Sequence, residues 1–105
     1  MNDMIEKLEA LINVRRTASP DSSYVASLFA KGREKMAQKL GEEATETIIA
    51  ALSGDPEKLT SEAADLMFHL LVLLAESGVA FDDVLDELAR REGISGIAEK
   101  AARSK

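Results

Sequence analysis

Two clusters of acidic residues at helical spacing carry the most chemical information in this 105-residue sequence. Glu42, Glu43 and Glu46 lie in the string KLGEEATE, whereas Glu62 and Asp65 open the apolar stretch SEAADLMFHLLVLL. Residues three or four apart share one face of a helix, so each cluster can present its carboxylates together. Carboxylates beside a buried face are unfavourable unless they are paired, protonated or bound to a cation. The pattern therefore predicts a site for a hard divalent metal such as Mg²⁺, which prefers oxygen ligands.

The elements that position these acids are predicted to be helices, because apolar residues recur at helical spacing and no sustained period-two pattern competes. The expected helices span about residues 3–16, 23–30, 33–52, 57–77 and 81–93, with a further turn or two at 97–103. The segment Ser53-Gly54-Asp55-Pro56 is typical of one helix ending and the next beginning. We expect an all-α fold, an antiparallel helical bundle of about four to five helices that forms a single domain over residues 1–105.

The short loop at residues 53–56 should bring the two acidic clusters to the same level of the bundle. Glu43 and Glu46 precede this loop, and Glu62 and Asp65 follow it, each pair at roughly nine residues, or about 14 Å along an antiparallel helix. Four carboxylates at matching depth can hold Mg²⁺ and still leave positions for water and phosphate oxygens.

A solvated helix face is the alternative interpretation of the first acidic cluster, because Glu46 lies nearly opposite the apolar stripe predicted for its helix. That stripe consists of Leu40, Ala44, Ile48 and Ala51. In the second cluster, Glu62 has the alternative of an early-turn acid that complements the helix dipole. Asp65 has the alternative of a buried carboxylate with a protein partner. Asp65 is nevertheless harder than Glu62 to dismiss as a metal ligand, since Asp is unfavourable inside a helix.

Other side chains near the acids are candidates for binding a substrate. Four basic residues precede the first acidic cluster: Lys31, Arg33, Lys35 and Lys39. They could hold a polyphosphate beside the metal, or they could form surface ion pairs such as Lys39 with Glu43. His69 follows Asp65 by four on the same helix face and is a further substrate-binding candidate, with a hydrogen-bonded core histidine as its alternative.

The composition limits the partners and the compartment. A net charge of −6 disfavours a general nucleic-acid binder, because affinity for the phosphate backbone depends on clustered Lys and Arg. The absence of Cys excludes disulfides and thiolate zinc sites and fits a reducing cytoplasm. The longest fully apolar run, residues 70–75, is far too short to cross a bilayer.

The stretch 66–75 is apolar on nearly all sides and should be buried, so we expect a homodimer with this helix near the interface.

The order of EExxE and ExxD resembles that of the all-α nucleoside triphosphate pyrophosphohydrolase superfamily. The segments SYVASLFAKG, QKLGEEATE, SEAADLMFHLLVLL and SGIAEKAARS together resemble the phosphoribosyl-ATP pyrophosphatase family of histidine biosynthesis. The resemblance implies a Mg²⁺-dependent enzyme, usually dimeric, that converts phosphoribosyl-ATP to phosphoribosyl-AMP and pyrophosphate. It also implies that Glu43, Glu46, Glu62 and Asp65 bind the metal, and that Glu42 is a further ligand or a base that orients water.

Two other functions fit the same residues. The fold and metal site could belong to a housekeeping hydrolase of non-standard nucleoside triphosphates. A small acidic helical dimer could instead act as a binding module without enzymatic activity. Substrate assays distinguish the first alternative, and titration with Mg²⁺ or Mn²⁺ distinguishes the second, because a solvated acidic face binds divalent ions only weakly.

Overall fold

The computed structural model describes residues 3–92 and 100, and every regular element in this part of the chain is a helix. The helices are α1 (Met4–Arg15), α2 (Tyr24–Lys31), α3 (Arg33–Ser53), α4 (Pro56–Glu76) and α5 (Phe81–Arg91). These bounds confirm the predicted all-α fold, and each predicted helix end lies within about two residues of the observed one, the normal uncertainty of helix ends. Apart from Lys100, the further turn predicted at 97–103 lies outside the described residues.

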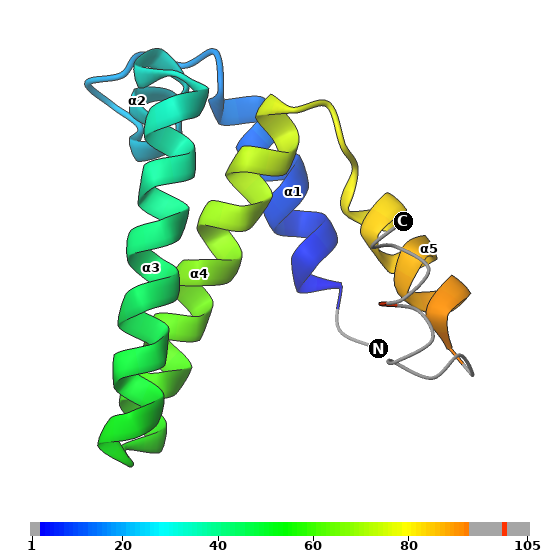
Figure 1. Cartoon of the computed structure of the whole chain (residues 1–105). Helices are drawn as coiled ribbons and strands as arrows, with labels where there is room; N and C mark the ends of the chain where they lie inside the picture. The colour runs from blue at the N-terminus through cyan, green and yellow to red at the C-terminus, as the bar shows by residue number, and fades with distance from the viewer. Residues whose placement is uncertain (1–2, 93–99, 101–105) are drawn as a thin grey trace.

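The two longest helices, α3 and α4, lie side by side as an antiparallel hairpin (Figure 1). Gly54 ends α3 with a φ of +78°, a left-handed conformation that glycine adopts without steric cost. Asp55 Oδ1 then accepts hydrogen bonds from the backbone N–H groups of Glu57 and Lys58, at 3.0 and 3.3 Å. Pro56 occupies the first helical position of α4, where its missing N–H costs nothing. The predicted end of one helix and start of the next at these residues is confirmed.

The apolar core lies at the end of the hairpin away from this turn, where α1 and α2 pack against α3 and α4 (Figure 1). Its buried members are Ile12, Val25, Leu28, Met36, Leu71 and Val72. Helix α5 has no buried side chain. It is joined to the rest through Phe81, whose ring packs against the core and whose backbone N–H donates to Glu9 Oε2 at 2.8 Å.

The predicted burial of α4 is only partly correct for the single chain. Within residues 66–75, His69, Leu71 and Val72 are buried, most of the others are half-buried, and Met67 is exposed. The reason is that α3 and α1 cover two sides of this helix and leave part of its apolar surface without a neighbour in the described chain. No single helix of the described residues is long and apolar enough to span a membrane. Helices α4 and α5 together reach the necessary length and apolar composition, but the chain bends by 107° between them.

The predicted apolar stripe of α3 is wrong as the face that packs within the chain. The buried residues of α3 are Met36, Glu43 and Ala50, whereas Ile48 on the predicted stripe is 60% exposed. The face of α3 that packs against α4 lies to one side of that stripe, and this face includes the carboxylate of Glu43. Apolar periodicity alone could not identify this face, because the buried acid interrupts the pattern by which a core face is found.

Candidate metal centre

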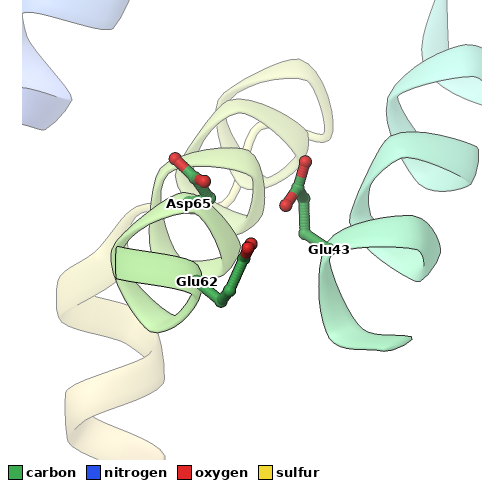
Figure 2. Close-up of side chains that lie close together, drawn as sticks. All are labelled: Glu43, Glu62 and Asp65. Carbon is green, nitrogen blue, oxygen red and sulfur yellow. The ribbon is translucent and has the colours of Figure 1, made fainter. Parts of the chain in front are cut away.

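Three acids from the two predicted clusters converge between the long helices. Glu43 extends from α3 toward Glu62 and Asp65 on α4 (Figure 2). Each residue can offer one carboxylate oxygen such that these oxygens all lie within 4.8 Å of one another. Glu43 is buried, Glu62 is half-buried and Asp65 is exposed, so the cluster opens to solvent on the side of Asp65. The sequence placed the buried charge on Asp65, and the structure corrects this to Glu43.

The Glu43 carboxyl has an electrostatic environment that disfavours its ionised form. Burial raises its pKa above the ordinary value of 4.5, contact with the Glu46 carboxyl raises it further, and the charge of Asp65 acts in the same direction. Only a smaller effect of His69 opposes the increase. Its Oε2 atom is buried and has no hydrogen-bond partner among the described residues. Buried polar atoms without partners are unfavourable, so this oxygen lacks an interaction that a ligand would supply.

Glu46 lies beside Glu43 but is exposed, and it is not part of the group of three converging oxygens. Its carboxyl contributes to the raised pKa of Glu43, which places the two side chains in contact. The structure thus brings three of the four predicted ligands together and leaves the fourth at the edge of the cluster.

The three carboxylates fit a hard divalent cation. Oxygens around an octahedral Mg²⁺ lie about 3 Å apart when adjacent and about 4.2 Å apart when opposite, and the three oxygens of this cluster lie within 4.8 Å of one another. A cation would offset the repulsion among the acids and would give Glu43 Oε2 the partner that it lacks. All the donors are oxygens, as Mg²⁺ prefers. An orphaned carboxylate oxygen within a cluster of acids is the observation that distinguishes this site from an ordinary acidic surface.

Glu42, the predicted catalytic residue, lies on an exposed flank of α3. Its carboxylate accepts hydrogen bonds from Gln38 Nε2 at 2.9 Å and from Lys39 Nζ at 3.4 Å. The bond from Gln38, followed by that from Lys39, lowers the pKa of Glu42 below its ordinary value. The ion pair proposed for Lys39 with Glu43 is therefore wrong, because Lys39 pairs with Glu42, one residue earlier, while Glu43 points inward to α4.

The remaining basic candidates lie farther from the acids. Arg33 Nη2 donates to the carbonyl oxygen of Glu76 at the end of α4, at 3.3 Å. Ten helical residues separate Arg33 from Glu43, a rise of about 15 Å. Lys31 is exposed at the end of α2, and Lys35 is half-buried near the start of α3. Among the four basic candidates, Lys39 is the nearest to the cluster along the helix, one turn before Glu43.

His69 has both ring nitrogens engaged by the protein. Nδ1 lies 2.8 Å from the carbonyl oxygen of Asp65, and because a carbonyl only accepts, Nδ1 carries the hydrogen. In the neutral ring, Nε2 then accepts from the hydroxyl of Tyr24 at 3.1 Å. This geometry favours the core-histidine interpretation over direct contact with a substrate. Tyr24 was not identified from the sequence, since the two residues are 45 positions apart and no local spacing relates them.

Comparison with known proteins adds a family to this geometry. The family model for phosphoribosyl-ATP pyrophosphohydrolase matches residues 5–92 of the chain. A protein named phosphoribosyl-ATP pyrophosphatase from Rhizorhabdus wittichii is 65% identical over 105 residues, which cover 100% of this chain and 99% of the relative. A protein of the same name from Erythrobacter litoralis is 65% identical over 99 residues, covering 94% of this chain and 95% of the relative. Another, from Methylococcus capsulatus, is 54% identical over 101 residues and covers 96% of both chains.

Proposed function

Because the chain belongs to the phosphoribosyl-ATP pyrophosphohydrolase family, we propose that it hydrolyses phosphoribosyl-ATP to phosphoribosyl-AMP and pyrophosphate in histidine biosynthesis. The chain is a hydrolase, and its substrate is a small nucleotide. The observation that carries the proposal is the convergence of Glu43, Glu62 and Asp65 within a chain that matches the family through residue 92. The lack of cysteine supports a cytoplasmic location for the enzyme.

Mg²⁺ is the proposed cofactor, held by Glu43, Glu62 and Asp65 with Glu46 as a fourth ligand. When bound, the ion supplies positive charge that offsets the phosphates and polarises the reacting phosphorus. The orphaned Oε2 of Glu43 and the proximity of Glu46 to Glu43 support this assignment.

The reaction adds water across the bond between the α and β phosphates. One oxygen–phosphorus bond forms from water, the bridging oxygen–phosphorus bond breaks, and pyrophosphate leaves. We assign Glu42 to orienting the water, because it adjoins Glu43 on α3 and its exposed carboxylate can accept a further hydrogen bond beside those from Gln38 and Lys39. We assign Lys39, with Lys31, Arg33 and Lys35, to binding the negative phosphates, while His69 acts indirectly by holding the main chain at Asp65.

A substrate assay tests the proposed function. The protein is incubated with phosphoribosyl-ATP and, separately, with a panel of standard and non-standard nucleoside triphosphates in excess Mg²⁺, and pyrophosphate release is measured. We expect rapid release from phosphoribosyl-ATP and little from the panel. Release from several triphosphates, with none from phosphoribosyl-ATP, would establish the housekeeping hydrolase instead.

Glu46→Gln tests whether the fourth acid belongs to the metal site. We expect Mg²⁺ affinity to fall by about tenfold or more, since even groups outside the first ligand shell cost 10- to 100-fold when removed. The metal-free protein should melt at a higher temperature, because the repulsion between Glu46 and Glu43 is lost. Glu57→Gln, at an exposed position in the first turn of α4, is the control. If the two variants behave alike in titration and in melting, Glu46 belongs to the solvated face.

We also propose that the enzyme is a homodimer formed through the hairpin. Three large apolar side chains on one side of α3 are exposed: Ile48 (60%), Ile49 (56%) and Leu52 (84%). Exposed apolar groups that cluster on one face are typical of interaction sites. Of the stripe that the sequence identified as apolar, only Ile48 belongs to this side of α3, and a second subunit would cover it together with Ile49 and Leu52.

Ile48→Glu should convert the dimer to monomers, because it places a charge in an apolar interface that cannot pair it. Sedimentation velocity at micromolar concentration measures the change. Ala10→Glu adds the same charge at an exposed position of α1 and should leave the dimer intact. A wild-type protein that sediments as a monomer under these conditions would contradict the proposal directly.

A further inference from the structure

Thr47 connects the main chains of two of the converging acids. It lies one turn after Glu43 on α3, and its Oγ1 is 2.7 Å from the carbonyl oxygen of Glu43. The same Oγ1 is 3.2 Å from the carbonyl oxygen of Glu62 on the opposite helix. Since carbonyls only accept and a hydroxyl has one hydrogen, Thr47 shares its proton between the two oxygens.

The contact to Glu62 distinguishes Thr47 from other threonines of the hairpin. A helical threonine commonly donates to the carbonyl four residues earlier, and Thr45 and Thr60 do so with Gly41 and Pro56, at 3.1 and 2.8 Å. Thr45 and Thr60 are exposed, whereas Thr47 is half-buried between α3 and α4. Its bond to Glu62 therefore joins the two helices at the level of the acids.

This bond leaves the carboxylates of both acids available. A carbonyl oxygen has two lone pairs, and the helical hydrogen bond uses one of them, so Thr47 takes the other.

A slide of one helix past the other by a single residue would displace the acids by about 1.5 Å, which is large compared with the tolerance of a Mg²⁺ site. An inter-helix bond anchored on both acidic residues opposes this slide where it matters most for the site.

We propose that Thr47 is a positioning residue that fixes Glu43 and Glu62 relative to one another for cation binding. This inference rests on the proposed metal site. The sequence alone does not indicate this role. Thr47 follows Glu43 by four residues and so shares its helix face, but only the structure shows that this face is buried. The predicted apolar stripe, which includes Ala44 and Ile48, lies on the neighbouring face of α3.

Calorimetric titration of the metal-free proteins with MgCl₂ tests this role without measuring catalysis. Thr47→Val keeps the shape of the side chain and removes the hydroxyl, so we expect Mg²⁺ affinity to fall by about tenfold. Thr47→Ser retains the hydroxyl and should bind Mg²⁺ as the wild type does. Thr45→Val is the matched control, since it removes an exposed hydroxyl of α3 that donates to Gly41 of its own helix, and its affinity should not change.

The outcomes separate this inference from the proposed function. If the wild type and Thr47→Val bind Mg²⁺ with equal affinity, the proposed role of Thr47 is overturned and the metal site remains in place. A lower melting temperature of Thr47→Val with unchanged Mg²⁺ affinity would assign the hydroxyl to stability alone, against the proposal. Failure of the wild type to bind Mg²⁺ would remove both. If Thr47→Val does not fold, Thr47→Ala and Thr47→Ser, which differ by one oxygen atom, give the same comparison, and equal affinities overturn the role.

Discussion

Glu43→Gln should lower pyrophosphate release from phosphoribosyl-ATP by at least about 100-fold, because loss of a direct ligand costs no less than loss of its supporting groups. The same change should stabilise the metal-free protein. It replaces the buried, repelled carboxylate with a neutral amide that can donate hydrogen bonds to the neighbouring acids. Relief of about 1 kcal/mol corresponds to a melting temperature several degrees higher in a chain of this size.

The pH dependence of this stabilisation follows from the direction of the pKa shift. The pKa of Glu43 is raised in the folded protein, so ionisation of this group destabilises the fold at pH values above the raised pKa. As the pH falls through that value, the carboxyl becomes protonated and the penalty disappears. The difference in melting temperature between Glu43→Gln and wild type should therefore be largest near neutral pH and should shrink in acid. A difference that grew as the pH fell would contradict the assignment.

Asp65→Asn should also lower activity by at least about 100-fold, but it should stabilise the metal-free protein much less than Glu43→Gln does, because Asp65 has the smallest effect among the neighbours that shift the pKa of Glu43. Asp65 is exposed, so its charge is already solvated and its removal should change the free energy of unfolding by no more than about 0.5 kcal/mol. An amide oxygen is a poorer ligand for Mg²⁺ than a carboxylate, which accounts for the loss of activity. The contrast with Glu43→Gln separates a buried ligand from an exposed one.

Thermal melting of the metal-free variants and turnover at saturating Mg²⁺ measure these effects, with Glu57→Gln as the common control. Near-normal turnover of Asp65→Asn in excess Mg²⁺ would remove Asp65 from the metal site. A melting temperature of Glu43→Gln equal to that of Glu57→Gln would mean that burial of Glu43 does not destabilise the metal-free fold.

The hairpin and its acids were predictable because their determinants are local. Gly54, Asp55 and Pro56 end one helix and start the next, and a short turn obliges the two helices to pack antiparallel. Residues equally distant from that turn then lie at the same level. This reasoning brings Glu43 together with Glu62 and Asp65 without knowledge of the rest of the fold.

The features that could not be predicted depend on contacts between distant segments. Periodicity identifies an apolar face but not the neighbour that covers it, so the stripe through Ile48 was assigned to the interior of the chain while the structure buries Glu43. The hydrogen bond between Tyr24 and His69 joins α2 to α4, and that between Thr47 and Glu62 joins α3 to α4. None of these partners is marked by a local pattern. Spacing along the helix also does not determine where the Glu46 carboxylate points, and this acid lies outside the group of three.

The measurement that tests the central claim most directly is pyrophosphate release from phosphoribosyl-ATP before and after removal of divalent metal. We predict that wild-type protein treated with a chelator releases none, and that excess Mg²⁺ restores its rate. Glu43→Gln should remain inactive after the same addition of Mg²⁺. Release that continues at the wild-type rate in the presence of chelator, or full recovery of Glu43→Gln with Mg²⁺, would contradict a metal-dependent hydrolase built on these acids.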